Sequence, residues 1–184
     1  MPFGISNEQE RETAMRTCMA NNGRSLWELS RQSTLLVVFL RHLGCTFCQE
    51  AVRDAARQRA DIQAGGATLV FVHPATAEDA ENFFAKYCMN DVPRISDPSG
   101  DLYRAFGLDR AGFREMLNPT VWLRALASIA AGNLPGRPRG NMFRMPGAFV
   151  VHEGRVVKSH FHRTIGERPD MANISAEGME ACRI

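Results

Sequence analysis

The sequence predicts an α/β fold in which a central mixed β-sheet is flanked by helices. Segments 34–40 and 67–73 are continuously apolar and rich in branched and aromatic residues, which is typical of strands buried on both faces. Helical spacing of apolar residues follows each of these segments. Two later apolar runs flank Glu153-Gly154 and predict a β-hairpin, which would add antiparallel strands to the sheet.

Each expected element follows from a local pattern of apolar residues and turn formers. Asn21-Asn22-Gly23 closes the first helix, because Asn and Gly tolerate the left-handed conformation. Thr76 stands at a helix-capping position. In chain order we expect a surface helix at 7–19, an amphipathic stretch at 25–30, a strand at 34–40, a helix at 45–60, a strand at 67–73, a helix at 77–89, a strand at 92–96, a turn at 97–100, a helix at 101–106, hairpin strands at 148–152 and 155–161, and a helical or loose tail at 164–184. This order matches the thioredoxin-like fold.

Length and composition favour one domain over residues 1–184. The chain is 45% hydrophobic and 23% charged, which is ordinary globular composition, and a chain of this length buries roughly 70% of its unfolded surface. Within the domain we expect an N-terminal helical extension at 1–24 and a helical insertion and loop at 109–140. The inserted helix at 121–131 would form a lid or a homodimer patch, or simply pack on the domain.

Charge and hydropathy exclude several classes of partner. The 22 basic and 20 acidic residues give a net charge of +2, without the basic stripe of a nucleic-acid-binding protein. Segments 35–40 and 121–131 are apolar but too short to span a membrane. Because residues 1–10 also lack a signal-peptide pattern, we expect a cytoplasmic protein whose five cysteines are reduced.

The main chemical signal is the pair Cys45 and Cys48, placed where a buried strand meets a helix. The N–H groups and partial positive charge of a helix N-terminus stabilise a thiolate there. The spacing brings the two sulfurs within disulfide reach, so one can attack and the other resolve a mixed disulfide. We favour Cys45 as the primary nucleophile because it is nearer the helix end, and Arg41 and His42 would add positive charge.

Two other interpretations of the pair stay open. The same spacing forms half of many zinc sites, and His160 and His162 would complete a Cys-Cys-His site if the fold brought them close. The chain has no second C-x-x-C, so we expect no bound metal and no cofactor, and favour redox chemistry. The alternative is a module that senses redox state or binds zinc without turnover, or a scaffold with a vestigial pair.

The other thiols and histidines have simpler expected roles. Cys88 falls on an apolar helical face and is expected to be a buried, inert thiol. Cys18 and Cys182 lie in the terminal segments. His73 precedes a proline at a strand end and is expected at the surface.

Met145-Pro146 stands directly before the strand expected at 148–152. In thioredoxin-like folds a proline at this position is cis and packs against the active-site cysteines, and the backbone before it pairs with a bound thiol substrate. We therefore expect a cis bond at Pro146, with Met145 and Pro146 as substrate-binding residues. A plain strand-entry proline is the alternative.

Several segments resemble the peroxiredoxin-like family of AhpC/TSA-type thioredoxin-fold proteins, whose relatives include selenoprotein L-like and selenoprotein U-like proteins. The resemblance covers most of residues 25–170 and is carried by 26–29, 39–50, 96–98, 103–108 and 147–151. The family's redox motif falls on Cys45 and Cys48. Selenocysteine replaces cysteine in selenoprotein relatives, which implies that the motif serves redox turnover.

The resemblance implies a thiol–disulfide oxidoreductase or an antioxidant peroxidase. In a reductase Cys45 would attack and Cys48 resolve. In a peroxidase Cys48 would attack peroxide and Cys45 resolve the sulfenic acid, although the typical pattern is Thr-x-x-Cys and here Cys45 holds the Thr position. A cation would stabilise the leaving oxygen, and the candidates are Arg41, Arg94 and Arg144. Expected partners are a thiol or disulfide protein, peroxide, or a small thiol such as glutathione, which the basic loop at 137–139 with Arg144 would steer.

Overall fold

A computed structural model describes residues 8–108, 144–162 and 167–182, with a few isolated positions between 123 and 132. Its sheet has the strand order β3-β2-β1-β4-β5. β1 pairs in parallel with β2, and β2 with β3, whereas β4 pairs antiparallel to both β1 and β5. The strands are β1 (Thr34–Phe39), β2 (Ala67–His73), β3 (Arg94–Ser96), β4 (Gly147–His152) and β5 (Arg155–Phe161). The predicted α/β class with a mixed sheet is confirmed.

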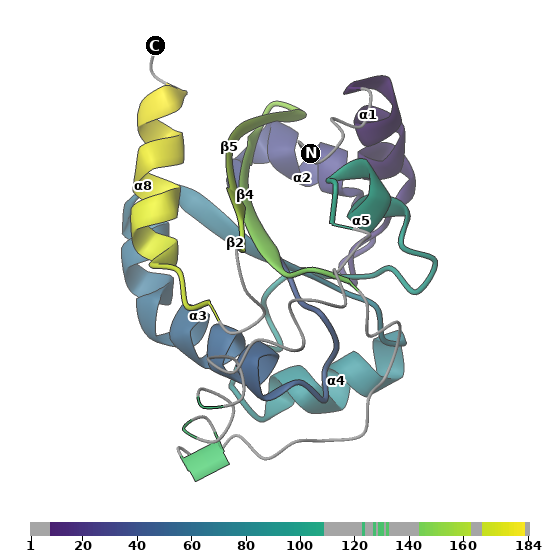
Figure 1. The fold of residues 1–184 in the computed structure, drawn as a ribbon. Coiled ribbons are helices and arrows are strands. Elements are labelled where there is room, and N and C mark those ends of the chain that lie inside the picture. Colours follow the sequence, from purple (N-terminus) through teal and green to yellow (C-terminus); the bar gives the residue numbers. More distant parts are fainter. Residues whose placement is uncertain are drawn as a thin grey trace.

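Helices cover both faces of this sheet (Figure 1). α3 and α8 lie side by side on one face, and α1, α2 and α5 lie on the other. The helices are α1 (Glu8–Thr17), α2 (Leu26–Gln32), α3 (Thr46–Ala64), α4 (Ala77–Ala85), α5 (Asp101–Ala105) and α8 (Met171–Ala181). Among the described residues, no helix is long and apolar enough to cross a membrane.

Two apolar clusters fill the space on either side of the sheet. Successive side chains of β1 alternate between them: Leu36 and Val38 join the cluster under α3, α4 and α8, whereas Val37 and Phe39 join the cluster under α1, α2 and α5. This explains why β1 has no polar face, because every residue of the strand is buried.

Most element boundaries agree with the sequence patterns, and the end of the fourth helix is an exception. The helix predicted at 77–89 stops at Ala85, and Cys88 adopts a left-handed backbone with φ of 54°. Met89 then turns inward and donates its N–H to the Phe84 carbonyl. Met89 is buried and Cys88 is exposed, so the prediction of a buried Cys88 is wrong.

The terminal segments pack on this framework. The first predicted helix is present as α1, whose Arg11 donates to the Ala105 carbonyl of α5. In the tail, Gly178 of α8 packs against Val150 so closely that an added Cβ would lie 2.5 Å from the valine side chain. The insertion predicted at 109–140 falls outside the described residues apart from isolated positions. The subdivision into extension, core and insertion stays a prediction.

Candidate active site

The cysteine pair lies at the end of the central strand. β1 ends at Phe39, and the Leu40 N–H still bonds to the Val72 carbonyl of the neighbouring strand at 2.9 Å. The chain then turns, and Cys45 caps the N-terminus of α3 with an extended backbone. Cys48 lies in the first turn of that helix. Because β1 is held on both sides by β2 and β4, this turn is anchored in the middle of the sheet.

Backbone contacts hold the Cys48 sulfur and the Cys45 main chain in a buried site. The Arg41 N–H donates to Cys48 Sγ over 3.2 Å, and the Cys45 N–H donates to the His42 carbonyl over 3.1 Å. Cys45 is 7% exposed and Cys48 is 3% exposed, and both are free thiols. A substrate must therefore enter the protein to reach either sulfur.

The two thiols share a hydrogen bond that separates their acidities. The Cys48 thiol donates to Cys45 and lowers the pKa of Cys45 to about 6, with the N–H groups at the start of α3 and Arg41 acting in the same direction against burial. The same hydrogen bond, together with burial, raises the pKa of Cys48. The pair therefore holds one proton and one negative charge near neutral pH.

A narrow cavity opens beside Cys48, where the ends of three strands meet. Its lining includes Cys48, Arg41, Pro146, His162 and Glu167. Its free space for a water-sized group is about 10 Å³, room for about one water molecule. Cys45 does not line this cavity, so Cys48 is the sulfur that faces it.

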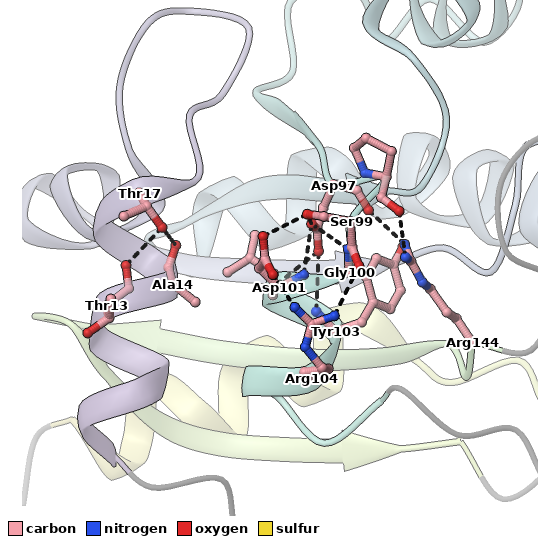
Figure 2. Close-up of polar contacts among 12 residues, drawn as sticks. Thr13, Ala14, Thr17, Asp97, Ser99, Gly100, Asp101, Tyr103, Arg104 and Arg144 are labelled. Atoms are coloured by element: carbon pink, nitrogen blue, oxygen red, sulfur yellow. Dashed lines mark hydrogen bonds and ion pairs between the residues drawn. The ribbon is translucent and has the colours of Figure 1, made fainter.

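One of the three arginines proposed as a leaving-group cation lies at the site. Arg41 lines the cavity and is 8% exposed. Arg94 instead pairs with Glu81 and lies against the Phe84 ring. Arg144 points into the turn before α5, where it donates to the Asp97 and Pro98 carbonyls and covers the Tyr103 ring (Figure 2).

His42 differs from the expectation that it would add positive charge. Burial, with the Arg41 charge beside it, lowers the pKa of His42 to about 4. The imidazole is therefore neutral at pH 7, and Arg41 is the cation that lowers the pKa of Cys45.

The predicted substrate-binding residues are separated by the sheet. Pro146 lines the cavity with Cys48, whereas Met145 packs with Phe39 and Phe149 in the cluster on the opposite face. The predicted cis bond at Pro146 is wrong, because the described residues contain no cis peptide. X-Pro bonds favour the trans form intrinsically, and Met145 is held by its N–H bond to the Leu108 carbonyl. Substrate binding by Met145 and Pro146 stays a prediction.

Other predicted residues lie away from the pair. His73 is 1% exposed at the end of β2, so its expected surface position is wrong; the segment carrying Ala20 bridges to Ile95 and covers this corner. Cys18 is half-buried, and burial raises its pKa to about 11. No three metal-ligating side chains gather at one point in the described part of the chain.

Sequence reasoning named His162 only as a zinc ligand and passed over Glu167. The pairing register of the β4–β5 hairpin would have predicted the position of His162. Gly147 pairs with Phe161, so the next positions outward are Pro146 and His162. A residue that follows β5 must therefore lie beside the proline that precedes β4.

The fold and the buried cysteine pair at a strand–helix junction define a thioredoxin-like protein. The bacterioferritin comigratory protein of Xanthomonas campestris superposes with a TM-score of 0.65 at 15% identity, covering 94% of this chain and 95% of that one. The peroxiredoxin 6 of Arenicola marina superposes with a TM-score of 0.62 at 10% identity, covering 90% and 69%.

The profile described as AhpC/TSA antioxidant enzyme matches residues 55–164, more than half of the chain, and the chain belongs to this family. The match begins after Cys45 and Cys48. Among curated relatives, prostamide/prostaglandin F synthase of Aquarana catesbeiana is 22% identical over 134 residues, or 71% of this chain and 64% of that protein. Peroxiredoxin-like 2C of Bos taurus is 30% identical over 84 residues, or 45% and 36%. The chain thus matches less than two thirds of either relative's length.

Proposed function

We propose that this chain is a thiol-dependent peroxidase in which Cys48 attacks a peroxide and Cys45 closes a disulfide. The observation that carries the proposal is that Cys48 faces a narrow cavity together with Arg41, while its thiol hydrogen-bonds to Cys45 behind it. Membership of the AhpC/TSA antioxidant enzyme family supports the same chemistry. In this proposal Cys45 resolves, whereas the sequence favoured it as the primary nucleophile.

The proton shared by Cys48 and Cys45 allows both steps of the reaction, attack on the peroxide and closure of the disulfide. The proton moves from Cys48 to Cys45, and the Cys48 thiolate attacks the terminal oxygen of the hydroperoxide. An S–O bond forms, the O–O bond breaks, and the departing oxygen takes a proton from water and leaves as an alcohol or water. The Cys45 thiol then attacks the Cys48 sulfenic acid, and the disulfide forms with loss of water. Arg41 offsets the negative charge that develops on the departing oxygen.

Turnover requires an external thiol to reduce the disulfide. We place this step in a reducing cytoplasm, with a protein thiol or a small thiol such as glutathione as the electron donor. The external thiolate would attack one sulfur of the pair, and a second thiol would release the mixed disulfide.

The experiment is single-turnover oxidation of the reduced protein by one equivalent of hydrogen peroxide. The wild-type chain should lose two thiols per peroxide consumed. Cys45→Ser should lose one and form a sulfenic acid at Cys48 that dimedone traps, and Cys48→Ser should not react at this site. Cys88→Ser, at an exposed position, is the matched control and should behave as wild type. Dimedone labelling of Cys45 instead of Cys48 would overturn the assignment.

Thiol–disulfide exchange is a second candidate, favoured by the lowered pKa of Cys45. In this case Cys45 would attack an external disulfide and Cys48 would resolve it. Incubating Cys48→Ser with oxidised glutathione tests the idea, because a stable mixed disulfide should then accumulate at Cys45. If no adduct forms while peroxide still oxidises the wild type, the exchange function is ruled out.

A further inference from the structure

A histidine lines the same cavity as Cys48 and has no role in the chemistry above. His162 follows the last residue of β5, and the hairpin register sets it beside Pro146. The β1–β4 register pairs Phe39 with Gly147, so Leu40 comes next to Pro146 in turn. The pairing of β4 with β1 and with β5 therefore positions His162 at the cavity.

The His162 ring carries a polar atom that nothing in the described protein satisfies. Its Nδ1 is fully buried and has no hydrogen-bond partner. Buried polar groups are nearly always paired in folded proteins, and an exception at a cavity needs an explanation. Since the ring lines the same cavity as Cys48, a small polar molecule there would be the natural partner.

Burial keeps this imidazole neutral, with His160 acting in the same direction and the Glu167 carboxylate acting against it. The His160 ring packs edge-on against it, with ring centres 5.5 Å apart, and His160 Nε2 lies 3.0 Å from Glu167 Oε1. The charged and titratable groups around it are the Glu167 carboxylate, the His160 imidazole, the Arg41 guanidinium and the Cys48 thiol. Burial lowers the pKa of His162 to about 4, so the ring carries one N–H donor and one acceptor at pH 7.

We propose that His162 is a catalytic residue that hydrogen-bonds the hydroperoxide group beside Cys48. The proposal deepens, and rests on, the peroxidase function proposed above. A hydroperoxide offers one O–H donor and two oxygen acceptors, which a neutral imidazole can match in either tautomer. The ring orients the O–O bond toward the Cys48 sulfur and stays neutral throughout, and the proton for the departing oxygen still comes from water.

The cavity also limits the size of the substrate at the point of attack. Its free space of about 10 Å³ admits roughly one water-sized group before the walls move. A hydroperoxide, whose reacting end has two oxygen atoms, therefore needs only a small movement of the walls, whereas a peptide disulfide is too bulky to reach Cys48 by this route. Pro146 and Phe47 belong to the apolar part of the wall, together with Val38, Phe39, Leu40 and Ala51.

The test compares peroxide with a reagent that has no oxygen to bind. His162→Leu removes the hydrogen bond at similar size, and His162→Gln keeps a polar group. The second-order rate of oxidation by hydrogen peroxide should fall about tenfold in His162→Leu, the loss expected for one hydrogen bond, and less than threefold in His162→Gln. The rate of iodoacetamide alkylation of the pair should stay within twofold in both variants.

The control is His152→Gln, a histidine of β4 whose Nδ1 contacts Thr34 Oγ1 at 2.9 Å, at the opposite end of the strand. It should oxidise at the wild-type rate. The tenfold loss should also be constant from pH 6 to pH 8, because His162 does not titrate there.

Three outcomes would overturn the proposal in distinguishable ways. Wild-type and His162→Leu oxidation at equal rates would remove His162 from the reaction and leave the peroxidase function intact. Equal slowing of oxidation and alkylation in His162→Leu would show a structural effect on the thiols. A wild-type pair that peroxide does not oxidise would overturn the peroxidase function itself, and the role of His162 with it.

Discussion

The hydrogen bond between the two sulfurs can be tested by replacing Cys48 with alanine. Its removal takes away the largest contribution that lowers the pKa of Cys45. A hydrogen bond to a charged group is worth about 1.5–3 kcal/mol, and about 1.4 kcal/mol corresponds to one pKa unit. The pKa of Cys45, about 6 in the intact pair, should therefore rise by about one to two units in Cys48→Ala.

The assay is the rate of iodoacetamide alkylation of Cys45 as a function of pH, followed by mass spectrometry of the Cys45 peptide. The thiolate is the reactive form, so the rate rises with pH and its midpoint gives the pKa. The midpoint should lie near pH 6 in the wild type and between about pH 7 and pH 8 in Cys48→Ala. Cys48→Ser is the matched control, because its hydroxyl can still donate. A midpoint that stays near pH 6 in Cys48→Ala would show that the helix terminus and Arg41 stabilise the thiolate alone.

Three further predictions concern stability. The Asp97 carboxylate accepts four backbone N–H groups at residues 100–103 (Figure 2), so Asp97→Ala should lower the unfolding free energy by about 2–4 kcal/mol in urea titrations; a loss below 1 kcal/mol would contradict this. Burial lowers the pKa of His73 to about 4, so the unfolded chain takes up the proton first, and this histidine alone should cost roughly 3 kcal/mol of stability as pH drops from about 6.5 to 4; His73→Gln should make the fall smaller by that amount and leave the contributions of His42 and His162. Gly178→Ala would press a Cβ against Val150 and should cost about 1–3 kcal/mol by thermal denaturation, and an unchanged midpoint would refute the close packing.

The sequence predicted the sheet and the cysteine pair well for a physical reason. A strand buried on both faces must be almost wholly apolar, as 35–40 is, and the turn after it ends at Cys45, where the helical spacing of apolar residues begins. Two residues within one helical turn of each other can be predicted to lie close together from their sequence spacing alone. The strand–helix junction therefore placed the two cysteines together, and their reactivity stays a prediction.

Features that depend on distant contacts were not predictable in this way. His73 is buried at the end of β2, with its ring beside Phe84 of α4 and with Ala20, some fifty residues earlier, bridged to Ile95 of the adjacent strand. No local pattern carries that information. Cys88 is exposed because α4 stops early in a left-handed turn at a residue that is not glycine. The cavity partner His162 becomes apparent only when the hairpin register is extended beyond Gly147 and Phe161.

The contact between the Arg41 N–H and the Cys48 sulfur, 3.2 Å long, makes a backbone amide report on the chemistry next to it. A charged sulfur is a stronger acceptor than a neutral one, so the amide proton senses each change at Cys48 from thiol to thiolate, sulfenic acid or disulfide. Arg41 is buried and lies two residues after the end of the central strand, next to Leu40, whose N–H still bonds to the Val72 carbonyl. A single resonance in a nitrogen-15 spectrum would thus follow the redox cycle without any label on the cysteines.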